Sequence, residues 1–110
     1  MAKYEKYFTG NFDTVLSQLH DTVMNGSMSA SYEDGSNWIN GGTRCAVRVY
    51  ERYSMIGSSR VSMNLTLVGN GNNLFLSAIT SGGSQAVLFK INTLGEESFL
   101  KCIEEFMNQY

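Results

Sequence analysis

The stretch VSMNLTLVGNGNNLFLSAIT, residues 61–80, decides the fold of this chain. Its first half alternates strictly between apolar and small polar residues, with the apolar set at Val61, Met63, Leu65 and Leu67. A period of two is that of a strand with one buried face and one face in water. The segment GNGNN then supplies turn residues, and the apolar run Leu74–Thr80 follows it. The stretch therefore predicts an antiparallel hairpin with an apolar face.

Further strands are predicted on the N-terminal side of this hairpin. Lys3–Phe8 carries aromatic side chains typical of a short strand. A period of two resumes at Ser27 and runs through Tyr32, and the segment EDGSN, 33–37, is expected to break that strand. After the turn signal Asn40-Gly41-Gly42, the longest strand is expected over Arg44–Met55. Consecutive tight turns between strands predict an antiparallel meander.

The C-terminal side offers one more candidate strand. Gly82-Gly83-Ser84 is followed by the apolar run Gln85–Ile91, which we interpret as a strand joined to Leu74–Thr80 by a hairpin. A phosphate-binding loop is disfavoured here, because such a loop stands directly before a helix. Neither GxxxxGK[ST] nor GxGxxG occurs.

Two segments have helical periodicity. In residues 12–25 the apolar side chains recur three and four positions apart, with Asn11 as the N-cap and Asn25-Gly26 as a left-handed stop. In residues 94–109 a second stripe appears, and Thr93 with Glu96 fits a capping box before it. Each stripe must be buried, and the sheet is the available surface. We therefore expect one two-layer α+β domain over residues 1–110, an antiparallel meander of five to six strands with both helices packed on one face.

Composition narrows the class of function. The chain has 110 residues, 43% of them apolar, and a formal net charge of −2. A weakly acidic chain is a poor partner for nucleic acid. No apolar run is long enough to cross a membrane, and the first residues lack the apolar core of a signal peptide, so a cytoplasmic protein is expected. Cys45 and Cys102 are then expected to be reduced thiols, with a disulfide or a reactive thiol as the alternative.

Residues with catalytic chemistry are few. The single histidine, His20, lies beside the apolar stripe of the first helix and is interpreted as a flank residue. Serines and aspartates are present, but no G-x-S-x-G elbow supports a Ser-His-Asp triad. One histidine and two distant cysteines do not form a metal site. No catalytic residue, metal or cofactor is predicted, and an enzyme is the weakest of the functional hypotheses.

The arginines form a row that suggests a binding site. Arg44, Arg48 and Arg52 share one face of the longest strand, with Ala46 and Tyr50 between them. Guanidinium groups suit carboxylate and phosphate, so this face is a candidate site for a small apolar or anionic ligand. The predicted ligand-binding residues are Arg44, Arg48, Tyr50 and Arg52. The alternative is an exposed sheet face whose charges pair with local acids such as Glu51.

The last two predicted strands carry apolar residues on both faces. One wet face is normal for a sheet with helices on the other, so the second apolar face needs cover from a chain segment, a partner subunit or a hydrophobic ligand. The candidate interface residues are Phe75, Ile79, Val87 and Phe89.

Two resemblances add to these expectations. The strings TSGGSQAVLFKINTLGEESFL and YEKYFTGNFD resemble a family of small uncharacterised bacterial proteins, a domain of unknown function, and the likeness covers the whole chain. It implies no activity and no site residues. The order of elements is similar to the helix-grip fold of START-like lipid-binding and hormone-binding proteins. This chain is shorter and has one helix after its first strand, which argues against a large ligand cavity.

The first functional hypothesis is therefore a non-enzymatic cytoplasmic domain that works by association, as a homo-oligomer and specifically a dimer. The alternative is a small carrier or sensor of an apolar or amphipathic ligand, whose acidic head group the arginine row would meet. An enzyme of unknown type is the third.

Overall fold

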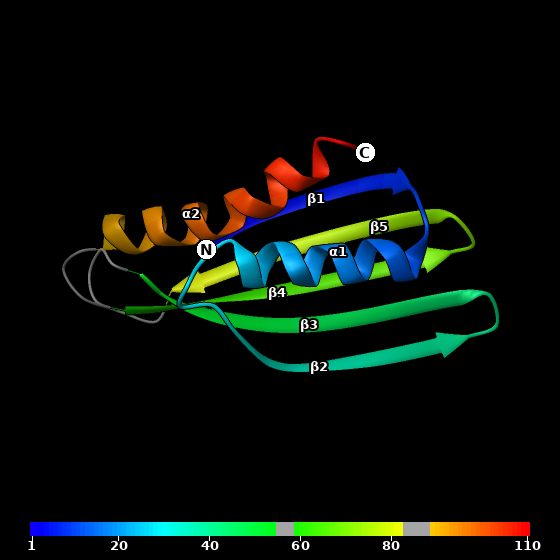
Figure 1. The fold of residues 1–110 in the computed structure, drawn as a ribbon, viewed down its shortest axis with the longest axis horizontal. Helices are drawn as coiled ribbons and strands as arrows, with labels where there is room; N and C mark the ends of the chain where they lie inside the picture. The colour runs from blue at the N-terminus through cyan, green and yellow to red at the C-terminus, as the bar shows by residue number, and fades with distance from the viewer. Residues whose placement is uncertain (55–58, 83–88) are drawn as a thin grey trace.

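The computed structural model describes residues 1–54, 59–82 and 89–110, and in these ranges five strands and two helices follow one another (Figure 1). The elements are β1 (Ala2–Thr9), α1 (Phe12–Asn25), β2 (Ser31–Asn40), β3 (Thr43–Ser54), β4 (Ser59–Asn70), β5 (Asn73–Gly82) and α2 (Phe89–Met107). No helix in the described residues is long and apolar enough to cross a membrane.

The five strands form one antiparallel sheet in the order β1-β5-β4-β3-β2. Strands β2 to β5 are neighbours in sequence and in space, so the predicted meander is confirmed, and β1 adds an edge beside β5. Tight loops close two of the hairpins, at the pairs Asn40↔Thr43 and Asn70↔Asn73. Each loop contains a glycine with positive φ, Gly41 at 60° and Gly71 at 58°, a conformation that other residues adopt only with strain.

Both helices pack on the same face of the sheet, as the sequence predicts (Figure 1). Helix α2 lies over β5, β4 and β1, and α1 lies beside α2 over β4. The core between the layers is apolar, and its largest fully buried side chains include Tyr50, Phe99, Leu19, Met63, Leu65, Leu67, Leu76 and Ile103. Strand β2 extends beyond α1, and nearly all its residues are exposed.

Helix α1 begins and ends where the sequence indicates. The Asn11 side chain accepts a hydrogen bond from the Thr14 amide at 2.9 Å, which satisfies one of the free N–H groups of the first turn. The predicted left-handed stop at Gly26 is wrong in its geometry, because Gly26 has φ −77° and ψ −12°. Its amide donates to the Thr22 carbonyl at 3.0 Å, so the chain leaves the helix from a helical conformation.

The predicted strand break at residues 33–37 is wrong, because these residues lie within β2. The strand runs through this segment, and a register shift falls between the pairs Tyr32↔Tyr50 and Asp34↔Val49. Glu33 is left without a partner, as in a β-bulge, which inserts one residue without ending the strand. Because β2 is an edge strand, the bulge disturbs pairing on one side alone, and the turn-like composition of the segment is tolerated.

The predicted strand Gln85–Ile91 is wrong over its described part, because Phe89 and Ile91 belong to α2. Val87 lies outside the described residues. The reason is topological: β1 pairs with β5 from Ala2↔Thr80 to Thr9↔Asn73, so the edge that a further hairpin strand would need is occupied. The predicted capping box also fails. Thr93 and Glu96 stand inside α2, and the Glu96 carbonyl accepts a hydrogen bond from Thr80 Oγ1 at 3.1 Å.

Candidate functional site

The arginine row lies on the helix side of the sheet. Arg48 stands directly opposite the core residue Leu65, and Arg52 stands opposite Val61. Since directly opposite residues of an antiparallel pair share a face, the three arginines of β3 point toward the helix layer. The alternative of an exposed sheet face is therefore corrected, and the three guanidinium groups have three different environments.

Arg44 is neutralised by α1. Its guanidinium donates two hydrogen bonds to the Asp13 carboxylate, at 2.8 and 3.0 Å, and lies 4.2 Å from the centre of the Phe12 ring. The hydrogen bonds from Arg44 hold the pKa of Asp13 below its usual value, with partial desolvation acting in the opposite direction. This forked geometry is the one that a carboxylate ligand would require, and an internal carboxylate already occupies it.

Arg52 contacts helix α2. Its guanidinium lies 4.7 Å from the centre of the Phe99 ring, and Nη2 donates to Ser98 Oγ at 2.9 Å. Burial lowers the pKa of this guanidinium, with the nearby Cys102 acting in the opposite direction. Arg52 therefore contributes to the packing of α2 on β3.

Arg48 is the arginine whose charge remains available. Its Nη1 donates to the Ser36 carbonyl at 3.1 Å and to the Val47 carbonyl at 2.9 Å. In the described part of the chain, no carboxylate lies within 4.0 Å of its guanidinium. Gly35 stands directly opposite, and a Cβ at Gly35 would lie 3.0 Å from Arg48 Cδ and 2.7 Å from the Val47 carbonyl oxygen. A glycine is therefore required for the Arg48 side chain to lie across β2.

Tyr50, the fourth predicted ligand residue, is buried. Its hydroxyl lies 2.9 Å from Nδ1 of His20, and the edge of the Tyr32 ring packs against it with 5.6 Å between ring centres. Burial raises the pKa of Tyr50 to about 12, with the Arg48 charge opposing that rise. The hydroxyl is thus used within the protein, and His20 is part of the contact between α1 and β3.

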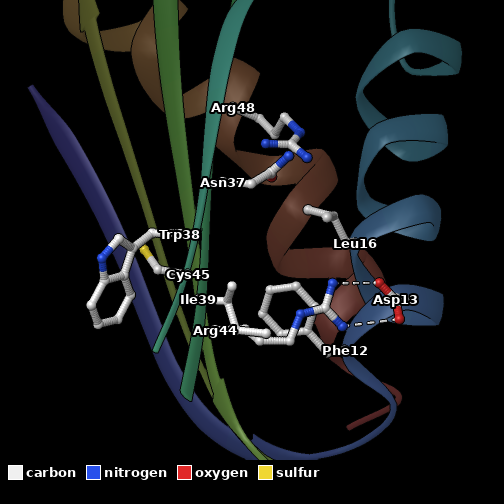
Figure 2. A pocket seen from close by; sticks show the side chains of 9 residues that line it. All are labelled: Phe12, Asp13, Leu16, Asn37, Trp38, Ile39, Arg44, Cys45 and Arg48. Carbon is white, nitrogen blue, oxygen red and sulfur yellow. Dashed lines mark hydrogen bonds and ion pairs between the residues drawn. The ribbon is translucent and has the colours of Figure 1, made fainter. Parts of the chain in front are cut away.

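Between α1 and the outer strands lies a groove of about 450 Å³, which we call the α1–β2 groove (Figure 2). Its walls are formed by Phe12, Asp13 and Leu16 of α1 and by Asn37, Ile39, Arg44 and Arg48 of β2 and β3. Trp38 and Cys45 border it through their strands, but their side chains point to the opposite face of the sheet (Figure 2). The sequence did not reveal Asn37 and Ile39 as wall residues, because the predicted strand break at 33–37 hid the alternation that places both on the helix side.

The described residues contain no group of three or more histidine, cysteine or acidic side chains that could hold a metal ion. Cys45 and Cys102 are free thiols, both half-buried. Burial raises the pKa of Cys102, with the Arg52 charge as the main opposing effect. A raised pKa disfavours the reactive thiolate at neutral pH.

The other face of the sheet, which we call the helix-free face, carries one apolar row across all five strands. Its members stand directly opposite one another in register, in the order Tyr7, Phe75, Val68, Cys45 and Trp38. We call this set the cross-strand row. The Tyr7 and Phe75 rings are 4.6 Å apart between centres, and Tyr7 and Trp38 are 82% and 55% exposed.

As predicted, β5 carries apolar residues on both of its faces, whereas the rest of the helix-free face is mostly polar. Beside the cross-strand row, Ser77, Thr66 and Ser36 occupy the next row, with Val47 among them. Of the predicted interface residues, Phe75 and Ile79 lie on this face, and Ile79 is 37% exposed. Phe89 is the first residue of α2 and is not part of the sheet.

These features define a two-layer α+β domain with an antiparallel sheet, helices on one face and an apolar row on the other. The chain belongs to the Family of unknown function (DUF6054), whose model matches residues 1–110. No curated protein and no solved structure matches the chain. The resemblance to START-like helix-grip proteins is therefore not confirmed.

Proposed function

We propose that this protein is a non-catalytic association domain that forms a homodimer through its helix-free face. The observation that carries the proposal is the cross-strand row. Large side chains such as Tyr7 and Trp38 are held in water on the face that neither helix of the described residues covers. Exposed apolar bands of this kind mark interaction surfaces.

The distribution of polar groups on this face fits a protein interface. Protein interfaces have an apolar centre depleted of charge and a polar rim. The middle of the helix-free face carries neutral side chains, including Val47, Thr66 and Ser77. Its charged groups lie toward the margins, at Lys3, Glu5, Asp34, Glu51 and Arg60. The molecule extends 47 Å by 25 Å in its two longest directions. A face of these dimensions is larger than the roughly 800 Å² that each partner buries in a standard interface.

A second copy of the chain is the occupant that the register favours. A two-fold axis parallel to the strands, between two facing sheets, brings β1 of one copy over β2 of the other. Tyr7 then faces the partner's Trp38, and Val68 faces its own counterpart. Lys3 and Asp34 stand at the two ends of one row of residues across the sheet. The same operation therefore brings Lys3 of one copy over the partner's Asp34. Apolar and charged groups are thus complementary within one symmetric arrangement.

The proposal also places the dimer in the cytoplasm. The free thiols of Cys45 and Cys102 support this location, because reduced cysteines are typical of that compartment.

Sedimentation equilibrium tests the dimer. The wild-type chain should sediment with twice the mass of one chain, and Phe75→Asp should sediment as a monomer, since a carboxylate in the cross-strand row would be buried in the dimer without a partner. Ile39→Asp is the matched control, because Ile39 is also an apolar strand residue but lies exposed on the helix side. It should remain a dimer.

A charge-reversal pair tests the symmetry. Lys3→Asp should weaken the dimer, and adding Asp34→Lys should restore it. A wild-type monomer, or a Phe75→Asp chain that is folded by circular dichroism and still dimeric, would contradict the proposal. If Phe75→Asp does not fold, the exposed pair Tyr7→Ser with Trp38→Ser replaces it.

A further inference from the structure

We propose that the α1–β2 groove binds a small amphipathic monocarboxylate, with the carboxylate on Arg48 and the apolar part between Leu16 and Ile39. This site lies on the opposite side of the sheet from the proposed dimer interface, and it goes beyond the proposed function.

The two arginines of the groove differ in whether a carboxylate of the protein already neutralises them. Two arginines border the groove, but Arg44 is engaged by both oxygens of Asp13, whereas Arg48 donates through Nη1 to two backbone carbonyls. Among the described residues, none accepts a hydrogen bond from Nε or Nη2 of Arg48. These two nitrogens form one side of the guanidinium fork, the geometry that a carboxylate accepts in bidentate fashion.

The Arg48 guanidinium is also held in place before any ligand arrives. The hydrogen bonds from Nη1 fix its orientation, and Gly35 leaves the space in which its stem crosses β2. Asn37 projects into the groove beside it and supplies a further polar group (Figure 2). A preorganised cation loses less conformational entropy when it binds an anion than a mobile one does.

The remaining walls of the groove are apolar. Ile39 is 67% exposed on the helix side of β2, and Phe12 and Leu16 of α1 lie across from it (Figure 2). The volume of about 450 Å³ lies within the range of small-molecule sites, roughly 300–1,000 Å³. An aliphatic or aromatic group of modest size would cover the exposed part of Ile39.

A single negative charge fits better than a double one. The Asp13 carboxylate borders the same groove, and its charge is balanced by Arg44 alone. A phosphate monoester would bring about two negative charges to one available guanidinium. A monocarboxylate matches the charge of Arg48 and its forked geometry.

The test is a titration of the ¹⁵N-labelled protein with octanoate, followed by ¹H–¹⁵N correlation spectra. The expected result is saturable shifts at the amides of Asn37, Ile39 and Arg48. Arg48→Gln should weaken octanoate binding about tenfold or more, the factor expected for loss of a charged hydrogen-bond pair. Arg60→Gln removes an arginine of the helix-free face and should leave binding unchanged.

Two further probes separate the parts of the proposal. Octanol retains the tail and acetate retains the head group, and both should bind at least about tenfold more weakly than octanoate.

Ile39→Glu places a carboxylate in the groove at an exposed position and should abolish binding, which keeps the test decisive if Arg48→Gln does not fold. The proposal is overturned if octanoate causes no saturable shifts, if octanol binds equally well, or if octanoate binds unchanged to the folded Arg48→Gln or Ile39→Glu protein. Sedimentation of these variants reports on the dimer separately, so the two proposals fail independently.

Discussion

The Nδ1 atom of His20 lies 2.9 Å from the hydroxyl of Tyr50 and joins α1 to β3 by a hydrogen bond at the border of the core. Tyr50 is fully buried, and the Tyr32 ring packs edge-on against His20 with 5.8 Å between ring centres. The only histidine of the chain is therefore a packing residue as well as a polar one. It connects α1 with β3 through Tyr50 and with β2 through Tyr32.

This contact predicts a pH dependence of stability. Burial raises the pKa of Tyr50 from 10.0 to about 12, so the folded protein holds the phenol proton more tightly than the unfolded chain does. The stabilisation is fully present below pH 10 and is lost as the pH rises from there toward about 12. Its size is on the order of 2 kcal/mol. Urea unfolding of the wild type and of Tyr50→Phe across this range measures it.

Tyr50→Phe should be less stable than the wild type near neutral pH by about 1 kcal/mol, because His20 loses its partner. Above pH 10 the difference in the free energy of unfolding should shrink, since phenylalanine does not titrate. A difference that stays constant up to about pH 12 would show that Tyr50 titrates as in the unfolded chain.

The ion pair between Asp13 and Arg44 gives a second prediction. Arg44 lowers the pKa of Asp13 below its usual 3.8, so the pair contributes stability above that pH and loses it as the pH falls through the folded-state pKa. In Arg44→Gln, the Asp13 pKa should rise toward 3.8. Carboxyl ¹³C chemical shifts, titrated with acid, report the pKa directly. Arg60→Gln is the control that should leave Asp13 unchanged.

The layers of the fold were predictable from the sequence because each depends on a local period. The alternation in Val61–Leu67 and the helical spacing from Phe12 to Val23 are each visible within a dozen residues, and both patterns agree with the buried faces. The apolar run 85–91 carries no such contrast between periods. Its described residues, 89–91, lie in α2, and β1, which is remote in sequence, occupies the edge beside β5.

The candidate site was only partly predictable. The spacing of Arg44, Arg48 and Arg52 showed that they share a face, but nothing local shows which face of the sheet the helices cover. Their separate roles depend on Asp13 and Ser98, which lie 31 and 46 residues away along the chain. The cross-strand row likewise combines residues from five strands, and the strand register alone aligns them.

The space at Gly35 gives a third prediction. A methyl group there would lie 2.7 Å from the Val47 carbonyl oxygen, which is backbone and cannot move without disturbing the pairing of β2 with β3. Gly35→Ala should therefore cost roughly 1–3 kcal/mol of unfolding free energy, as other overpacked substitutions do. Gly42→Ala is the matched control, because the nearest atom to its Cβ, Asn70 Oδ1, would be 3.8 Å away. If both variants unfold at the same urea concentration as the wild type, Gly35 does not lie as close to the Val47 carbonyl and to Arg48 as described.

The orientation of α1 about its own axis gives the last prediction. Leu16 and Leu19 both belong to the apolar stripe of the sequence, but Leu19 is fully buried, whereas Leu16 stands at the border of the α1–β2 groove. Leu19→Ala should cost about 2–5 kcal/mol, because it leaves a cavity in the core. Leu16→Ala should cost about 1 kcal/mol, because part of that side chain is already in water. Urea unfolding followed by circular dichroism measures both. Equal losses would mean that α1 is rotated toward β2, which would close the groove and remove the space beside Arg48.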